Sequence, residues 1–480
     1  MLFNSIEFLF IFLPITFFVY FFLNKKRLVN LATGWLVIAS LYFYAYWKLE
    51  YLPIILCSMV FNYTIGTTLS KADNLKINKK ALMIFGVVVN LGALFYYKYF
   101  DFVIYNLNKV FHGDFNYMHI VLPLAISFFT FQQIAYLVDS YKGETKEYDF
   151  LTYALFVTFF PQLIAGPIVH HKEMMPQFAK LKNRIINPKN ISIGLFLIAI
   201  GLAKKVLLAD FFSPFVQQTF DVIPHLTCFE AWCAAISYTF QLYFDFSGYS
   251  DMAIGLGKMF GFQFTENFDF PYASANLSEF WRRWHISLGS WFRDYLYIPL
   301  GGSRVSSKIR IALNLLIVWL ATGIWHGTDF TFILWGILHG ILIVFEKITG
   351  LPEKIKNKTF LQILYRGFTL FIVIFGWMLF RSEDMVQAMD YIRSLFKLNG
   401  NPWRGDMFIF NFREYYFTLI FAFISAFPII RYIRSSISKK GKLSENTVNV
   451  VWYCIQLLLA VISLSCLAMN THNPFLYSNF

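Results

Sequence analysis

Apolar runs of about 20 residues, separated by short polar stretches, recur along the chain from its first residues to its last. A helix rises ~1.5 Å per residue, so roughly 20 mostly apolar residues cross the hydrocarbon core of a bilayer. The pattern therefore predicts an all-α, polytopic membrane protein. The candidate segments lie near residues 5–24, 30–47, 51–69, 81–98, 120–138, 150–168, 191–213, 229–244, 310–325, 331–346, 362–380, 414–430 and 447–469.

The first run, MLFNSIEFLFIFLPITFFVYFFL, has the hydrophobicity of a signal peptide. It has no basic n-region and no small-residue cleavage site, and its apolar core is longer than that of a signal peptide. We expect it to be the first span.

Composition agrees with lipid as the surrounding solvent. Of the 480 residues, 57% are hydrophobic, 20% are aromatic and only 14% are charged. A soluble core cannot bury that much apolar surface. The chain shows no repeat with a period of roughly 20–50 residues and no low-complexity tail. We therefore expect one membrane domain over residues 1–480, with a motif-rich core at about 120–345.

The net charge of +13 would suggest nucleic acid in a soluble protein. Here the basic residues cluster in short stretches between apolar runs, at NKKR (24–27), KADNLKINKK (71–80) and RYIRSSISKKGK (431–442). This is the distribution that the positive-inside rule predicts for cytoplasmic loops. We expect the lipid bilayer as a partner, and no nucleic acid.

One stretch conflicts with simple alternation of the spans. Residues 170–190 hold five Lys or Arg against one Glu, yet alternation from a cytoplasmic NKKR places them outside. The 150–168 segment, which contains Pro161, Gly166 and Pro167, is therefore predicted to enter the membrane and turn back. Irregular backbone at membrane depth needs protein or a wet cavity around it. We expect such a cavity in the middle of the protein.

A second irregular region is expected from Tyr243 to Gly302. The stretch YFDFSGYSDMAIG places Asp245, Ser247 and Asp251 in an apolar context, where unpaired carboxylates are costly and are usually functional. They could equally cap a broken helix or bind backbone amides.

The stretch that follows predicts an interfacial or re-entrant helix. Asn276 and Glu279 form a capping-box pattern, so a helix should begin near Leu277. Arg282 and Arg293 point away from its apolar face, His285 lies at the margin of that face, and Gly289 weakens the helix. The apolar face comprises Leu277, Phe280, Trp281, Trp284, Leu288, Trp291, Phe292 and Tyr295.

Of the nine histidines, His285, His326 and His339 lie within or beside apolar segments between residues 281 and 346. Histidine can act as a general base, a general acid, a metal ligand or a structural residue. The spacing of His326 and His339 matches no metal-ligand pattern, and the five cysteines include no CxxC pair. No cysteine lies in these stretches and no GxSxG elbow is present. Two readings remain: a structural histidine, or a base that deprotonates an attacking hydroxyl.

Several long motifs, in order, resemble those of the membrane-bound O-acyltransferases. Within that superfamily the chain is most similar to the bacterial branch of alginate and peptidoglycan O-acetylation proteins. The resemblance covers nearly the whole chain, including MLFNSIEFLFIFLP. The motifs are LPLAISFFTFQQIAYLVD (122–139), FPQLIAGPI (160–168), QLYFDFSGYSDMAIGLGKMFGF (241–262), WRRWHISLGSWFRDYLYIPLGGSR (281–304) and GIWHG (323–327).

The resemblance implies a ring of roughly 11–13 transmembrane or re-entrant helices around a central tunnel. The family's invariant histidine falls on His326, the catalytic base. Its second polar position, asparagine in many eukaryotic relatives, falls on His285, which leaves a second base, a positioning residue or an oxyanion donor open.

The resemblance also implies a donor substrate, acetyl-CoA, and we expect no bound cofactor and no metal. Arg282, Arg283 and Arg293 are candidate contacts for its phosphates, since arginine forks match phosphate oxygens. Positive-inside topology would explain the same arginines. Candidate donor-site or tunnel residues also include Asp245, Ser247, Asp251 and Trp325.

We therefore expect an acetyltransferase in the bacterial cytoplasmic (inner) membrane. It would serve O-acetylation of a cell-surface polysaccharide, alginate-like or peptidoglycan, or of a carrier, with an extracytoplasmic SGNH-type acetyltransferase as partner. A lipid-directed acyltransferase is the alternative within the enzyme class. A transporter or channel would suit the intramembrane carboxylates, but it predicts a symmetry between two halves that the sequence does not show.

Overall fold

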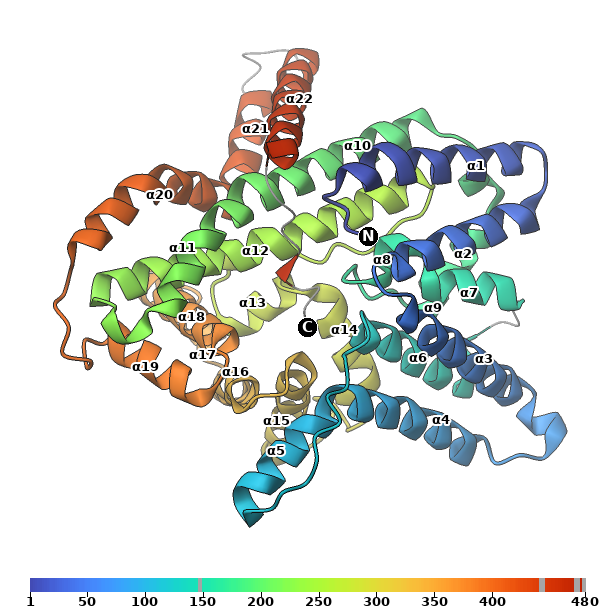
Figure 1. Ribbon diagram of the computed structural model, residues 1–480, viewed down its shortest axis with the longest axis horizontal. Helices are drawn as coiled ribbons and strands as arrows, with labels where there is room; N and C mark the ends of the chain where they lie inside the picture. The colour runs from blue at the N-terminus through green and yellow to red at the C-terminus, as the bar shows by residue number, and fades with distance from the viewer. Residues whose placement is uncertain (146–148, 440–444, 470–474, 477–480) are drawn as a thin grey trace. The chain divides into compact units, whose positions relative to one another are not determined.

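The computed structural model describes residues 1–145, 149–439, 445–469 and 475–476, most of them in helices (Figure 1). Within these ranges no β-strand forms, and the only β-type pairing is an isolated bridge between Phe268 and Trp284. The chain divides into two compact units. That residues 1–480 act as a single domain stays a prediction.

The first unit comprises residues 1–198, 249–266 and 467–480. Its helices are α1 (Leu13–Lys25), α2 (Val29–Ala45), α3 (Leu52–Leu75), α4 (Lys79–Leu94), α5 (Phe100–Phe111), α6 (Ile126–Tyr141), α7 (Phe150–Thr158), α8 (Phe160–Leu163), α9 (His171–Ala179) and most of α10 (Pro188–Ala203). Short π-helical or 3-10 segments occur at Phe8–Phe12, Leu49–Tyr51, Phe95–Tyr99 and Leu181–Arg184.

The second unit comprises residues 199–248 and 267–466, and it carries most of the candidate site residues. Its helices are α11 (Asp210–Asp221), most of α12 (Cys228–Met259), α13 (Leu277–Arg283), α14 (Ile286–Phe292), α15 (Lys308–His326), α16 (Phe330–Thr349), α17 (Leu351–Ile355), α18 (Thr359–Arg381), α19 (Met385–Leu395), α20 (Asp406–Ala426), α21 (Ile429–Lys439) and most of α22 (Glu445–Met469). Short π-helical or 3-10 segments occur at Lys204–Ala209, Ile223–His225, Pro271–Ala273 and Arg293–Tyr297.

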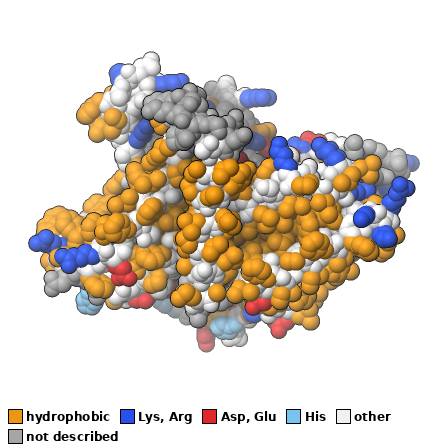
Figure 2. Space-filling view, turned by 90° about the horizontal axis from the view of Figure 1, so that it is seen from above, with side chains coloured by type: hydrophobic (Ala, Val, Ile, Leu, Met, Phe, Trp, Pro, Cys, Tyr) orange, Lys and Arg blue, Asp and Glu red, His pale blue; other side chains and the backbone are white. Residues whose placement is uncertain are grey.

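In the described part of the chain, eight helices are long and apolar enough to cross a membrane, and α2 is a shorter apolar helix. Hydrophobic side chains also predominate on the face shown in Figure 2. The predicted all-α polytopic architecture is confirmed, whereas the ring, the tunnel and the sidedness of the loops stay predictions. The eight helices are Phe8–Lys25, Leu49–Lys71, Lys79–Phe111, Pro188–Asp221, Lys308–His326, Phe330–Thr349, Thr359–Arg381 and Val450–Met469.

The segment predicted to be irregular at 150–168 is indeed broken. Helix α7 ends and α8 begins at Phe159, whose backbone lies at φ −52° and ψ 110°, just before Pro161. Helix α8 is only four residues long, and the chain then runs without a helix to α9. Residues 153–171 are all buried. The break therefore lies inside protein, which is where broken backbone is tolerated at membrane depth.

The prediction that an irregular region begins at Tyr243 is wrong. Helix α12 runs unbroken for 32 residues, so Asp245, Ser247 and Asp251 are mid-helix and cap no break. Gly248 lies within this helix without interrupting it, and its role is in packing. A Cβ atom there would lie 2.7 Å from the Gly201 carbonyl oxygen, so glycine allows the two backbones to approach.

The helix predicted to begin at Leu277 is confirmed, but it ends earlier than predicted. The Asn276 side chain caps α13 by accepting from the Glu279 N–H at 2.8 Å, and the Glu279 carboxylate accepts from the Ala275 N–H. The helix breaks at Trp284 and His285, not at Gly289. Trp284 is extended and His285 lies in the left-handed region, so α14 begins in a new direction.

The basic stretch predicted as a loop at 431–442 is mostly helical, since 431–439 belong to α21. Residues 440–442 lie outside the described residues.

Candidate active site

His326 is the last residue of α15, and a short turn fixes where that helix stops. Gly327 is extended, with φ −162° and ψ 174°, so the helical hydrogen bonding ends there. Asp329 then caps α16 by accepting from the Thr331 N–H at 2.9 Å. The histidine is therefore held at a hairpin between two apolar helices.

Helices α15 and α16 pack side by side at unusually close range (Figure 1). A Cβ atom on Gly323 would lie 2.5 Å from the Phe332 carbonyl oxygen, and one on Gly336 would lie 2.5 Å from the Trp319 carbonyl oxygen. Small residues permit this approach in membrane helices. The contact sets the register of His326 against α16.

Aromatic rings surround the His326 imidazole, which is 3% exposed. Its centroid lies 4.9 Å from the ring of Trp325, 5.2 Å from that of Trp335 and 5.2 Å from that of Phe380. These residues come from α15, α16 and α18. A histidine in such surroundings is shielded from bulk water.

His285 occupies the break between α13 and α14, with φ 47° and ψ 53°. A non-glycine residue pays for this left-handed conformation with strain, and histidine tolerates it better than most. The Asn267 side chain supports the strained turn. Its Oδ1 lies 3.2 Å from His285 Nδ1 and accepts from the Ser287 hydroxyl at 2.9 Å, while the Asn267 carbonyl accepts from the Ile286 N–H.

This contact fixes the tautomer of His285. Because Asn267 Oδ1 accepts from both the Ser287 hydroxyl and the Ser287 N–H, it is the oxygen of the amide. His285 Nδ1 must therefore carry the proton and donate it. In the neutral ring, Nε2 then has a lone pair and can only accept.

His285 and His326 are brought together through Trp325. The His285 ring lies 6.5 Å from that of Trp325, which in turn lies 4.9 Å from that of His326. The Phe246 ring of α12 packs edge-on against His285 at 4.7 Å. Burial lowers the pKa of His285 to about 3, so it is uncharged at neutral pH.

His339, the third central histidine, lies on α16 inside an aromatic cluster. Its Nδ1 donates to the Trp335 carbonyl oxygen at 2.9 Å, and its ring lies 5.0 Å from those of Trp335 and Trp281. This arrangement is that of a structural histidine satisfied by its own helix.

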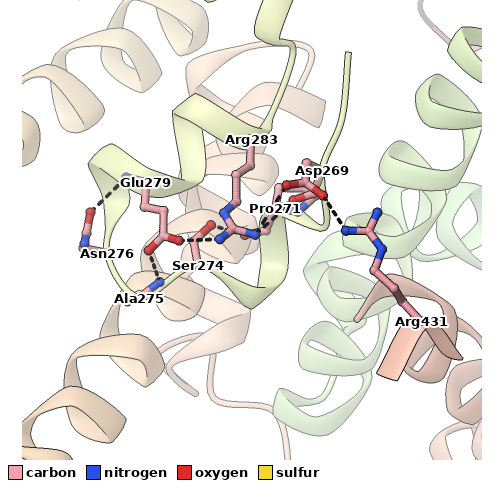
Figure 3. Close-up of polar contacts among 8 residues, drawn as sticks. All are labelled: Asp269, Pro271, Ser274, Ala275, Asn276, Glu279, Arg283 and Arg431. Carbon is pink, nitrogen blue, oxygen red and sulfur yellow. Dashed lines mark hydrogen bonds and ion pairs between the residues drawn. The ribbon is translucent and has the colours of Figure 1, made fainter. Parts of the chain in front are cut away.

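The three candidate arginines differ in their partners. Figure 3 shows the Arg283 guanidinium between Glu279, at 2.6 Å, and Asp269, at 3.8 Å. Arg293 pairs with the neighbouring Asp294 at 2.7 Å. Arg282 is exposed and forms no ion pair with any residue in the described ranges. Of the three, Arg282 has the guanidinium most available to a phosphate.

Arg431 of α21 also forms an ion pair with Asp269. Its guanidinium lies 3.5 Å from Asp269 on the side away from Arg283, and 4.8 Å from the centre of the Phe270 ring (Figure 3). Helix α21 therefore contacts the loop that begins at Asn267.

Asp245 belongs to a different group of charges. Its Oδ1 accepts from Lys205 Nζ at 2.8 Å, and the same ammonium lies 2.7 Å from Asp210. Asp245 and Lys205 are each 1% exposed. Ser247 is also buried and Asp251 is partly buried. The structure therefore places Asp245 in a buried ion pair with Lys205.

Sequence reasoning overlooked three polar residues that shape this region: Asn267, Lys205 and Glu346. Lys205 and Glu346 could have been recognised from the sequence, because each is an ionisable residue within an apolar run. Asn267 lies in an ordinary loop sequence, and only the fold brings it to His285.

Comparison with known proteins identifies the family. The sequence model of "MBOAT, membrane-bound O-acyltransferase family" matches residues 41–382. The chain is 42% identical to the peptidoglycan O-acetyltransferase of Helicobacter pylori, over 83% of this chain and 80% of that protein. It is 36% identical to the probable alginate O-acetylase AlgI of Pseudomonas putida, over 100% of both. It is 26% identical to the teichoic acid D-alanyltransferase of Bacillus subtilis, over 54% of this chain and 69% of that protein. The chain belongs to the membrane-bound O-acyltransferase family and is a multi-pass membrane enzyme of the acyltransferase class.

Proposed function

We propose that this enzyme transfers an acetyl group from acetyl-CoA, supplied at the cytoplasmic side, to hydroxyl groups of a cell-surface polysaccharide. Its place would be the cytoplasmic (inner) membrane of a bacterium. The observation that carries the proposal is the buried group of His285, Trp325 and His326 at the end of an apolar span. Such a group offers a buried imidazole where water is scarce, as the deprotonation of a sugar hydroxyl requires.

His326 is the proposed base. It takes the proton of the acceptor hydroxyl as the oxygen attacks the thioester carbonyl, and a tetrahedral intermediate forms. The C–S bond then breaks, the new C–O ester bond remains, and the imidazolium returns its proton to the departing thiolate. The aromatic rings around His326 exclude competing water, which would otherwise hydrolyse the thioester.

His285 is proposed to orient the hydroxyl, since a pKa of about 3 makes it a weak base near neutral pH. An oxyanion donor would need a proton on Nε2. With Nδ1 donating to Asn267 and a pKa of about 3, the ring has its only proton on the other nitrogen. This argues against the oxyanion-donor role and for a hydrogen-bond acceptor.

The acceptor is proposed from the relatives' names. Peptidoglycan and alginate, named for two of them, are both polysaccharides that lie outside the cytoplasm once polymerised. Passing the acetyl group to an SGNH-type acetyltransferase outside the membrane would bring it to either polymer. Arg282 is the proposed phosphate contact for the donor, since Arg283 and Arg293 are paired with acidic side chains.

The test compares His326→Ala with His225→Ala, an exposed histidine outside this site. Base-released acetate is measured from purified cell-surface polysaccharide, at protein levels matched by immunoblot. We expect loss of acetate in His326→Ala and a wild-type level in the control. Undiminished acetate in His326→Ala would refute the proposal. Acetyl label that appears in lipid would favour a lipid acceptor, and uptake into vesicles without acyl donor would favour a transporter.

A further inference from the structure

Glu346 is a carboxylate in the last turns of the apolar helix α16, and it is 3% exposed. An ionised group in such a place is costly unless it is hydrogen-bonded, and within a membrane protein it usually has a role. Its role must be sought in the groups that it binds.

Four donors converge on this carboxylate. Its Oε1 accepts from the Leu277 N–H at 2.9 Å and from the Tyr365 hydroxyl at 2.8 Å. Its Oε2 accepts from the Ser278 N–H at 2.8 Å and from the Ser278 hydroxyl at 2.5 Å. Two of the four are backbone groups in the first turn of α13, which have no partner within their own helix.

Glu346 thus caps α13 from another helix. Asn276 satisfies the Glu279 N–H locally, and Glu346 satisfies the two N–H groups before it. A negative charge at this end also complements the helix dipole. Helix α13 has only seven residues, so fixing the position of its first turn also fixes the position of its last turn. His285 follows that last turn by two residues.

The same helix also borders the other histidine. Trp335 of α16 contacts the His326 ring at 5.2 Å, and Glu346 lies eleven residues, about three helical turns, further along. Helix α16 therefore contacts His326 through one side chain and holds the His285 segment through another.

We propose that Glu346 is a positioning residue for acyl transfer: its carboxylate anchors α13 to α16 and so holds His285 beside Trp325 and His326. This inference rests on the proposed function, because it assigns His285 a place in that reaction. Glu346 does not touch the substrates and acts only through α13.

The test substitutes Glu346→Gln, which keeps the size but replaces one accepting oxygen by an NH2 donor. Glu353→Gln is the matched control, since Glu353 is exposed on the adjacent helix α17. The purified full chain in nanodiscs is assayed with acetyl-CoA as donor and muropeptides as acceptor. We expect kcat to fall about tenfold or more while the KM for acetyl-CoA stays within about twofold, as loss of orientation without loss of donor binding requires.

Two measurements report the position of α13 without any turnover. Hydrogen exchange at the Leu277 and Ser278 amides should quicken about tenfold in Glu346→Gln, since their acceptor is weakened. Labelling of His285 by diethyl pyrocarbonate, read by mass spectrometry, should rise above its low level in the wild type. If Glu346→Gln is not produced in folded form, Tyr365→Phe and Ser278→Ala, which each remove one donor, should show the same changes to a smaller degree.

The outcomes separate the two proposals. If His326→Ala is inactive but Glu346→Gln keeps wild-type kcat and wild-type His285 labelling, the positioning role is overturned and the proposed function survives. If Glu346→Gln lowers kcat with unchanged exchange and labelling, the anchoring route is overturned. If wild type and His326→Ala transfer equally little acetyl to any acceptor tried, the proposed function fails. The positioning role in that reaction fails with it, while exchange and labelling still report the anchor.

Discussion

The rings of His285 and Trp325 lie 6.5 Å apart, with their planes at 68°. Trp325 is the residue before His326, so this one contact joins the break between α13 and α14 to the end of α15. Residues separated by forty positions in the sequence are thereby brought into one buried group. What holds each histidine in that group can be tested one contact at a time.

Asn267→Ala removes the acceptor that fixes the His285 tautomer and supports the strained turn. Loss of buried hydrogen bonds costs about 1–3 kcal/mol each, so we expect transfer to slow roughly 10- to 100-fold. The measurement is acetyl transfer by the purified protein. Asn401→Ala, at a partly buried asparagine of another loop, is the control and should keep its rate. Wild-type activity in Asn267→Ala would show that His285 needs no fixed tautomer.

Lys205→Met should leave Asp245 and Asp210 without their shared counter-ion. Breaking a buried ion pair from one side costs about 3–5 kcal/mol, whereas replacing both partners by apolar residues is often nearly neutral. We therefore expect a large fall in the apparent melting temperature for Lys205→Met and partial recovery in Lys205→Met/Asp245→Leu. The exposed pair Lys172–Glu144 gives the comparison, because its removal should cost less than about 1 kcal/mol. Equal losses for both pairs would contradict the structure.

Gly323→Leu should separate α15 from α16. The first side-chain atom alone would lie 2.5 Å from the Phe332 carbonyl oxygen, which is backbone and cannot rotate away. We expect reduced thermal stability and loss of activity, since His326 ends the same helix. Gly367→Leu on α18 is the control, because a Cβ there meets no heavy atom within 4 Å. A functional Gly323→Leu protein would mean that the helices do not pack this closely.

Stability should fall as the pH is lowered from about 6.5. Burial lowers the pKa of His285 to about 3 and that of His171 to about 4. Between these values and 6.5 the unfolded chain binds a proton that the folded chain does not, so unfolding becomes easier by up to about 1.4 kcal/mol per pH unit for each residue. Above 6.5 both states are uncharged at these positions, and the contribution is constant.

The check is the apparent melting temperature in detergent at several pH values between 4.5 and 7.5. His171→Gln and His285→Gln should each show a shallower slope than the wild type, and the exposed His225→Gln should not. Parallel slopes for all four proteins would refute burial of the two imidazoles.

Sequence patterns predicted the helices well wherever the helix has to be apolar over its whole length to cross a bilayer. The apolar runs that became α15, α16 and α18 needed only length and hydropathy, and the start of α13 was readable from Asn276 and Glu279, which are local in sequence. The break at His285 was not readable, because it depends on Asn267 and on the Phe246 ring, which the fold alone brings there. Likewise Asp245 was expected in an irregular segment, and its partner, Lys205, lies forty residues away in the sequence.

The positive φ of His285 also limits which residues can occupy this position. Asparagine, aspartate, histidine and glycine are the residues that accept left-handed backbone most readily, whereas branched and bulky side chains are strongly disfavoured there. The resemblance places asparagine here in many eukaryotic relatives and histidine in this chain, and both satisfy that restriction. The backbone therefore restricts the residues that can stand at this position independently of catalysis, and an exchange of histidine for asparagine here would keep the turn.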